Sequence, residues 1–546
     1  MFVPARTSVL IVLTLWLLPW AESAGSGPVE SEGDVAVTRL IAQWMAIGDD
    51  DLQAFYAARA MRPAWRDANV VAALAAAIAT LDDDGLVPGD YHPETLLGAY
   101  HDAHAAQPRA DALARFDIEL SRLLITVLHH LASGKVDPAA IDPGWDLPRT
   151  APLLDFAVVS QAVDARQFET VFATARPGHA LYAGLRTGLA RYRDLERRGG
   201  WGTLPARRTA LHPGDRHADV PLLRARLALV EDVAEPPPDT CADPAAATPM
   251  PDPNCYDDGL AAAVRRFQRH HLLKADGVVG ANTRAALNVP VAARIDQIRI
   301  NLERARWLLS GLPESFVLVD VPGYQLSYFR PGGDIWRARI VVGRPTRPTP
   351  TLRSAITHLT FNPTWTVPPT ILREDVLPKV RKDAGYLAQE NIAVLDASGA
   401  RLDPRGIDWS RPGNLILRQA AGPHNALGRV AIRFPNTHTV YLHDTPAQEL
   451  FEFDRRALSS GCVRVEHALE FVRLLLDDET RWNADAIAAV VAAGSTREVD
   501  LARRVPLILY YWTVQTDADG ALSFRPDLYR RDAALLAALE RPPGQR

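Results

Sequence analysis

The spacing of apolar residues changes along the chain and predicts a helical first part and a mainly β second part. Residues 33–205 are rich in alanine and leucine and repeat their apolar positions every three to four residues, which predicts an α-helical scaffold domain. One helical stripe in it consists of Phe116, Leu120, Leu123, Leu124, Val127, Leu128 and Leu131. Beyond residue 315 apolar residues alternate instead, as in Val317, Val319 and Val321, which predicts β-strands. We therefore expect a multidomain α+β protein.

Between these regions, residues 211–289 predict a small unit of three helices. The first helix covers Val220–Val230, and the second carries Leu260 and Phe267 on one face. The third is short and starts near Asn282, after a glycine-rich turn. This spacing leaves room for a small core of its own.

The last domain is predicted over residues 293–546. A linking helix at Ala293–Leu309 precedes the alternating strands. Residues 368–412 are polar, mixed and rich in helix and strand breakers, so they predict an inserted capping subdomain. The strand pattern resumes at Leu415–Gln419, and a terminal helix is expected over Asp532–Leu539.

The first 23 residues have the pattern of a secretory signal peptide. Arg6 supplies the positive start, Val9–Trp20 is almost wholly apolar, and Ala21–Ser23 is a small-x-small cleavage site. The apolar run is too short to span a bilayer comfortably, so a retained membrane anchor is the less favoured alternative. We expect an exported protein that works in the periplasm.

Length and composition narrow the classes of function. A chain of 546 residues is too long for one core, and 47% hydrophobic with 23% charged residues is ordinary globular composition. The net charge of -5 gives no overall basic field for nucleic acid. The sequence contains no HExxH, P-loop or dinucleotide fingerprint, so we expect neither a metal nor a cofactor.

Three cysteines remain for an oxidising compartment. Cys241 and Cys255 flank part of a proline-rich insertion at Glu235–Asn254 and could form a disulfide. Cys462 is then unpaired, and an odd cysteine in an exported protein is either a reactive thiol or a buried, inert one.

The surroundings of Cys462 favour the reactive thiol. His443 ends an alternating strand, and Cys462 follows Ser-Ser-Gly in a tight turn shortly before a helix. The helix start and Arg464 supply positive potential that favours thiolate, and the histidine can take the thiol proton. Successive amides of Gly461 and Cys462 can converge on an oxyanion. These parts predict an acyl-transfer site, whereas the alternative is a small core cysteine and a structural histidine.

Two stretches of this region carry a family resemblance. The pair YLHDTP and SSGCVRV resembles the catalytic motif of the L,D-transpeptidases. The whole chain is similar to their long, three-part periplasmic members, the YcbB-like group, through DGLVPGDYH, FNPTWTVPPTI, PHNALGRVAIRFPN and LYYWTVQTDADGALSFRPDLYRRD. The stretch AAAVRRFQRHHLLKADGVVGANTRAAL resembles the peptidoglycan-binding type 1 family, although the proline-rich insertion departs from that compact pattern.

The resemblance implies a role for each site residue. Cys462 would be the nucleophile, His443 its acid–base partner, and the backbone carbonyl of Asp444 would orient the histidine. We prefer this carbonyl to the carboxylate because adjacent strand side chains face opposite ways. The residues implied to line the oxyanion hole are Ser460, Gly461 and Cys462. Those implied to meet the substrate are Arg464, Tyr441, Asn425 and Trp365.

The resemblance also implies a reaction and its partners. We expect 3→3 cross-linking of peptidoglycan through a Cys462 thioester, with donor and acceptor stem peptides as substrates and release of D-alanine. Carbapenems would acylate the cysteine, and cell-wall synthases are candidate partners. The alternatives are L,D-carboxypeptidase or exchange activity, attachment of a protein at the same site, or a catalytically silent wall-binding scaffold. A papain-like protease would need the cysteine before the histidine, and the order here is reversed.

Overall fold

The computed structural model describes residues 32–46, 49–105, 107–142, 144–146, 154–231, 252–309, 311–383, 385–516 and 520–543. The expected signal peptide and Cys241 lie outside these residues. Cys255 is disulfide-bonded, whereas Cys462 is a free cysteine. Within the described part, no helix is long and apolar enough to cross a membrane. The same part holds no group of three or more histidine, cysteine or acidic residues that could hold a metal ion.

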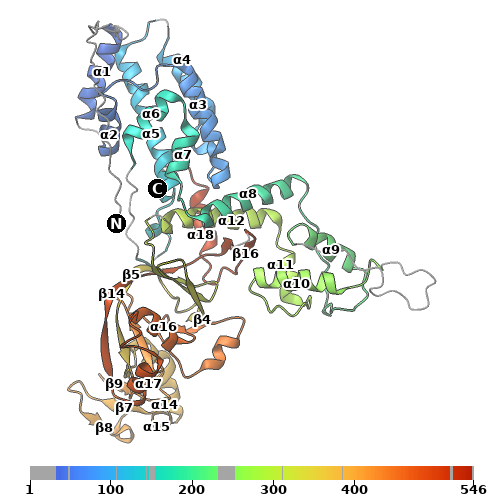
Figure 1. The fold of residues 1–546 in the computed structure, drawn as a ribbon, viewed down its shortest axis with the longest axis vertical. Helices are drawn as coiled ribbons and strands as arrows, with labels where there is room; N and C mark the ends of the chain where they lie inside the picture. Colours follow the sequence, from blue (N-terminus) through green and yellow to red (C-terminus); the bar gives the residue numbers. More distant parts are fainter. Residues whose placement is uncertain are drawn as a thin grey trace, which may run out of the picture.

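A helical bundle forms one end of the molecule (Figure 1). Its helices are α1 (Glu32–Met45), α2 (Asp50–Ala58), α3 (Ala68–Ala79), α4 (Leu96–Ala103), α5 (Ala110–Ser133), α6 (Phe156–Ala165) and α7 (Phe168–Ala175). The amphipathic helix α5 supplies much of the core, and it ends where Gly134 takes a φ of 90°. A Cβ at Gly134 would lie 2.5 Å from the Trp307 indole nitrogen, so only glycine allows this close approach.

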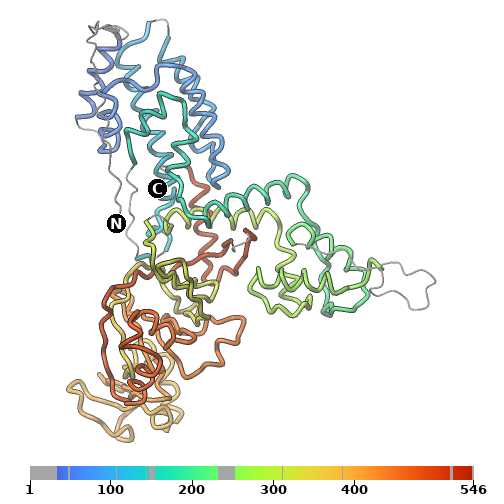
Figure 2. Tube along the Cα trace, in the orientation of Figure 1, coloured from blue at the N-terminus to red at the C-terminus, as the bar shows by residue number. Residues whose placement is uncertain are grey.

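Two long helices join the bundle to the three-helix module and to the last domain (Figures 1 and 2). Helix α8 (Ala180–Arg197) packs along α12 (Val291–Leu308), and α18 (Asp532–Leu539) also contacts α12. The side chains of α8 share a core with α12 and with strand residues of the last domain. Helix α8 lies within the predicted scaffold 33–205, but its apolar face is buried against α12 and outside the bundle core.

The three-helix module extends to one side of this helix pair (Figure 2). It consists of α9 (Val220–Ala228), α10 (Asp258–His270) and α11 (Ala281–Leu287) around a small separate core. Gln268 fixes the turn between α10 and α11, since its side chain hydrogen-bonds Asp276, the Gly277 amide and Thr283 at 2.8–3.1 Å. The polar residues typical of the module therefore hold its own turn in place.

The last domain is built on one large sheet. Its strands are β1 (Trp145–Asp146), β2 (Phe316–Asp320), β3 (Gln325–Phe329), β4 (Ile335–Gly343), β5 (Thr351–Phe361), β10 (Val430–Arg433), β11 (Leu442–His443), β12 (Ala457–Ser459), β13 (Val463–Val465) and β14 (Arg497–Tyr510). Their order is β1-β5-β10-β11-β13-β4-β3-β2-β14, and β12 pairs with β4. Strand β14 also pairs with β5, so the sheet closes on itself around the main core.

Helices and short strands complete the domain. Helix α16 (Ala468–Leu476) packs Phe471, Val472 and Leu475 into the core, and α17 (Ala484–Ala492) lies beside it. A hairpin of β15 (Val514–Thr516) and β16 (Leu522–Phe524) leads to the terminal helix. The predicted multidomain α+β class is confirmed.

The capping subdomain is larger than predicted. It has a separate four-stranded sheet of order β6-β9-β7-β8, formed by β6 (Trp365–Thr366), β7 (Ile392–Leu395), β8 (Arg401–Leu402) and β9 (Ile416–Gln419). Its helical part comprises α13 (Pro369–Ile371), a π-turn at Leu372–Val376, α14 (Leu377–Lys382) and α15 (Tyr386–Gln389). Strands β6 and β9 lie outside the predicted range 368–412, because their pairing with each other closes the subdomain.

Candidate active site

The sheet brings His443 and Cys462 to the same cavity. Strand β11, which ends at His443, pairs in parallel with β13, which starts directly after Cys462. The pairing places His443 opposite Arg464, and the Val463 amide donates to the Tyr441 carbonyl at 3.1 Å. Parallel neighbours need a crossover between them, and the short helix at Gln448–Glu452 together with β12 provides it. Both side chains line a cavity of about 1210 Å³.

His443 is buried and held in one tautomer. Its Nδ1 lies 2.6 Å from the carbonyl oxygen of Asp444. A carbonyl can only accept, so Nδ1 carries the hydrogen and Nε2 is the basic nitrogen. Burial lowers the pKa of His443 to about 3, and the charge of Arg464 adds to this effect. The imidazole is therefore neutral at physiological pH.

The carboxylate of Asp444 points elsewhere. Its Oδ2 is 2.7 Å from Arg429 Nε and also accepts the Arg429 amide at 2.9 Å. Gly428, at a φ of 63°, lies against this side chain, where a Cβ would be 2.6 Å from Asp444. The ion pair thus turns the acid toward Arg429, and the histidine meets the carbonyl of Asp444.

The thiol of Cys462 is partly exposed, and burial disfavours its ionised form. Burial raises the pKa of Cys462 above its ordinary value, while Tyr441, Arg433 and Arg464 act in the opposite direction. The expected thiolate is therefore wrong for the resting protein. The helix that was expected to stabilise the thiolate begins only at Ala468, with strand β13 between it and Cys462, and the effect of a helix dipole falls off within the first turn.

The turn before Cys462 offers two amides to a ligand. Gly461 has a φ of 116°, and its N–H donates to Ser459 Oγ at 3.1 Å. The Ser459 hydroxyl in turn donates to the Cys462 carbonyl at 2.5 Å. Among the described residues, the amides of Ser460 and Cys462 donate no hydrogen bond. The expected oxyanion donor at Gly461 is thus already occupied, whereas the amides on either side of it are free.

Arginine dominates the charge of the cavity. The basic side chains that line it are Arg347, Arg433, Arg464, Arg530 and Arg531, and the acidic one is Asp142. Arg464 is largely buried and forms no ion pair in the described part of the chain, and Arg433 lies 4.1 Å over the ring of Tyr441. Arg347 and Arg531 have acidic partners, and the positive charge that remains in the cavity favours a ligand that carries carboxylates.

Tyr441 and Trp365 lie where they were expected. The ring of Tyr441 is 5.7 Å from that of His443, and its hydroxyl interacts with Cys462. Trp365 lines the cavity from the first strand of the capping subdomain. Asn425 does not reach the cavity. It is buried, donates to the Ala420 carbonyl and accepts the Leu427 amide, both at 2.8 Å, so it stabilises a turn.

Sequence reasoning missed Arg347, which connects the turn to the capping subdomain. Its Nη1 donates to Ser460 Oγ at 2.9 Å, and its Nη2 is 2.6 Å from Glu374. It also forms an ion pair with Asp375, which Arg344 shares at 3.1 Å. No local sequence pattern predicts these contacts, because they join three segments that are far apart in the chain.

The C-terminal segment also forms part of the wall. Tyr529 donates to the Gly343 carbonyl at 2.7 Å and accepts the Thr349 amide at 3.1 Å, which fixes the loop that carries Arg347. Arg531 lies 2.8 Å from Asp142 at the edge of the cavity. The motif RPDLYRRD was noticed in the sequence, but no site role was assigned to these residues.

Comparisons with known proteins agree with this picture. Residues 314–491 match the family model of the L,D-transpeptidase catalytic domain. Residues 50–189 match a model described as a scaffold domain, and residues 249–287 match one described as a "Putative peptidoglycan binding domain". The resemblance of the sequence to the catalytic family and to the binding module is thereby confirmed.

Similar proteins were found by comparison of the sequence and of the structure. A protein named "Putative L,D-transpeptidase" from Haemophilus influenzae is 37% identical over 219 residues, which are 40% of this chain and 44% of that protein. A solved L,D-transpeptidase from Mycobacterium smegmatis shows 15% identity, covering 36% of this chain and 58% of the other, at a TM-score of 0.17. One from Xylanimonas cellulosilytica shows 14% identity over 56% of this chain and 100% of the other, at a TM-score of 0.18.

Proposed function

We propose that the protein is an L,D-transpeptidase that forms 3→3 cross-links in peptidoglycan, since residues 314–491 form a catalytic domain of that family. One observation carries the proposal. A free cysteine and a neutral histidine of fixed tautomer line one arginine-rich cavity, next to two unoccupied amides. Nucleophile, base and oxyanion donors are the parts of an acyl-transfer site.

The first half-reaction forms a thioester. As the Cys462 sulfur attacks the carbonyl carbon of the third stem residue, Nε2 of His443 takes the thiol proton. The Ser460 and Cys462 amides hold the oxygen that becomes negative. The tetrahedral intermediate then breaks its bond to the D-alanine nitrogen, which receives the proton from His443. D-Alanine leaves, and the stem remains on sulfur.

The second half-reaction transfers the stem to an acceptor. The side-chain amine of a diaminopimelate on another stem attacks the thioester carbonyl, and His443 accepts a proton from that amine. The intermediate collapses, the new amide bond forms, and the sulfur leaves and regains the proton from His443. The capping subdomain covers the cavity through Trp365 and Thr370, which limits hydrolysis of the thioester by water.

Substrate charge activates the histidine in this proposal. Arg464 lowers the pKa of His443 and has no acidic partner in the described residues. A stem carboxylate that pairs with Arg464 cancels much of this repulsion and makes the imidazole a stronger base. Proton transfer from the thiol is thereby linked to the presence of substrate, which protects the free enzyme from unproductive reactions of the thiolate.

The location and partners belong to the same proposal. A domain that acts on peptidoglycan, a module that resembles wall-binding domains and an expected signal peptide together fit the periplasm. Carbapenems, as acylating agents, would form a thioester with Cys462. Cell-wall synthases remain candidate partners, because the enzyme needs stems that other enzymes have made.

Mass spectrometry of products tests the function. Purified protein is incubated with disaccharide–tetrapeptide from peptidoglycan, and we expect a dimer of the donor mass plus acceptor mass less one D-alanine. The Cys462→Ala protein should give none, while Cys241→Ala with Cys255→Ala should retain activity. Tripeptide monomer without dimer would assign a carboxypeptidase instead. A Cys462→Ala protein that still makes dimers would refute the assigned nucleophile.

A further inference from the structure

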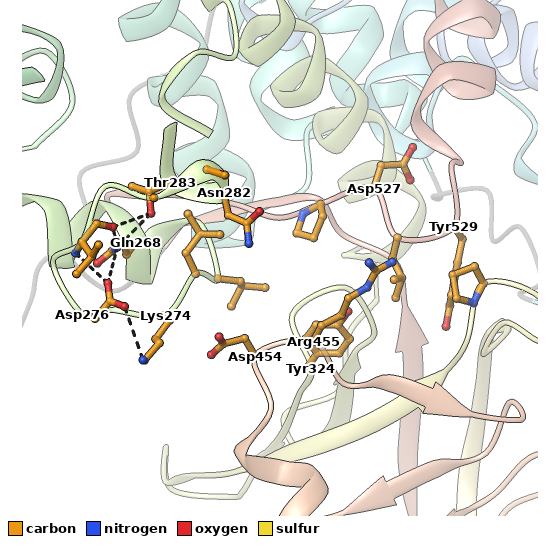
Figure 3. A pocket seen from close by; sticks show the side chains of 18 of the residues that line it. Gln268, Lys274, Asp276, Asn282, Thr283, Tyr324, Asp454, Arg455, Asp527 and Tyr529 are labelled. Atoms are coloured by element: carbon orange, nitrogen blue, oxygen red, sulfur yellow. Dashed lines mark hydrogen bonds and ion pairs between the residues drawn. The ribbon is translucent and has the colours of Figure 1, made fainter. Parts of the chain in front are cut away.

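A second large cavity lies where the three-helix module meets the catalytic domain (Figure 3). Its volume is about 910 Å³. One wall comes from the α10–α11 turn and α11, and the opposite wall from Tyr324 and the loop with Asp454 and Arg455. The C-terminal segment with Tyr529 closes the third side. The cavity therefore exists only because the module is seated against the domain.

The two cavities adjoin each other. Pro345, Tyr529 and Arg530 line both of them. The loop with Asp454 and Arg455 lines the second cavity. It belongs to the crossover between His443 and Cys462, so the same segment of the chain continues to the catalytic cavity. A ligand that extends out of the catalytic cavity past Tyr529 enters the second one.

The two cavities differ in charge. The catalytic cavity has five arginines and one acid among the described residues that line it. In the second cavity three basic side chains face three acidic ones, so the charges balance. The charged residues of that second set are Lys274, Asp276, Asp454, Arg455, Asp527 and Arg530. Such a site suits a neutral polar ligand, whereas the arginine-rich one suits carboxylates.

Two polar side chains of the second cavity have no hydrogen-bond or ion-pair partner among the described residues. Asn282 and Asp454 are exposed on facing walls and make no hydrogen bond or ion pair within the described residues. The Tyr324 hydroxyl is buried there without a hydrogen bond of normal geometry, and the guanidinium of Arg455 lies beside it. Amide, carboxylate and guanidinium groups offer the donors and acceptors that hydroxyl and N-acetyl groups of a sugar can meet.

The wall on the module side is rigid. Gln268 is almost wholly buried and ties the turn to α11 through Asp276, Gly277 and Thr283. Asn282 directly precedes Thr283 on α11, so the backbone that carries its side chain is fixed at the cavity. A fixed backbone lowers the entropy cost of binding there.

We infer that the second cavity binds the glycan chain of the peptidoglycan whose stem lies in the catalytic cavity. This inference rests on the proposed function and adds the substrate part that the function leaves open. Three extended residues between the sugar and the reacting carbonyl span about 10 Å, so the sugar emerges close to the mouth of the catalytic cavity. The module and the catalytic domain thus form one continuous groove, with sugar at one end and stem at the other.

Matched tryptophan variants test the inference. Asn282→Trp fills the cavity from α11, and Ala285→Trp places the same side chain on the same helix at an exposed position outside the cavity. We expect Asn282→Trp to lower kcat/KM for disaccharide–tetrapeptide about tenfold, through KM, and to leave sugar-free tetrapeptide unchanged. Asp454→Trp, on the facing wall, should give the same selective loss, and Ala285→Trp should change neither substrate.

Binding measured without turnover separates this inference from the proposed function. Peptide-free oligosaccharide of N-acetylglucosamine and N-acetylmuramic acid is titrated into the Cys462→Ala protein by calorimetry. Binding that Asn282→Trp abolishes supports the glycan site even where no cross-linking is found. No binding, or equal loss of both substrates in the Asn282→Trp protein, would overturn the inference while leaving the catalytic assignment intact.

Discussion

The protonation state of Cys462 yields a prediction with a definite size. Burial raises the pKa of the Cys462 thiol above its ordinary value, in spite of Tyr441, Arg433 and Arg464. A free cysteine has a pKa of about 8.5, so the thiolate fraction of Cys462 at pH 7 should lie below the few per cent that a free thiol shows. Burial lowers the pKa of His443 to about 3, so its ring is neutral at rest and does not form an ion pair with the sulfur.

Alkylation with iodoacetamide measures this directly. The rate at Cys462 should rise about tenfold for each pH unit from 6 to 9, without a plateau, because only the thiolate reacts. Cys462→Ala gives the background. Tyr441→Phe removes the hydroxyl that favours the thiolate, so it should slow alkylation at a given pH.

One result would refute the reasoning. A preformed thiolate–imidazolium pair gives a rate that is high and constant between about pH 5 and 8, since both groups are then charged across that range. A plateau there would show that desolvation does not control the sulfur. It would also remove the reason for substrate charge to activate His443.

Two further perturbations follow from the ion pairs. Arg347→Ala removes the contacts to Ser460 and Glu374, so we expect kcat/KM for cross-linking to fall about tenfold while alkylation of Cys462 is unchanged; wild-type turnover would show that the connection is dispensable. Arg306→Met leaves Glu303 buried without its partner at 2.7 Å, and should cost about 3–5 kcal/mol in urea unfolding. Adding Glu303→Gln should restore part of this, and a loss under about 1 kcal/mol would contradict the expectation.

The sequence was most informative where chemistry and local pattern coincide. His443 and Cys462 were both found from their immediate neighbours, since a strand end and a Ser-Ser-Gly turn are local features. The carbonyl of Asp444 followed from alternation along a strand, and in the structure its carboxylate does turn to Arg429. Helices such as Asp532–Leu539 were predicted with the bounds that the structure has, because their periodicity is short-range.

Prediction from the sequence was weakest where charge and burial are set by distant segments. The thiolate was expected from Arg464 and a nearby helix, but desolvation by the folded domain outweighs both. Asn425 looked like a ligand, yet its amide is used within its own turn. The capping subdomain was drawn too narrowly, since strand pairing between Trp365 and Gln419 cannot be deduced from either segment alone.

The candidate reactive residues, their order and their helical or extended setting could thus be predicted from the sequence itself, because these depend on side-chain chemistry and on neighbours within a few positions. Tertiary structure alone decided that burial raises the pKa of the thiol, that Arg347 reaches Ser460, and that a second cavity opens beside Tyr529. Each of these depends on segments that are remote in the chain and meet only after folding. Desolvation and long-range ion pairs arise when these remote segments pack together, and no local sequence pattern predicts that packing.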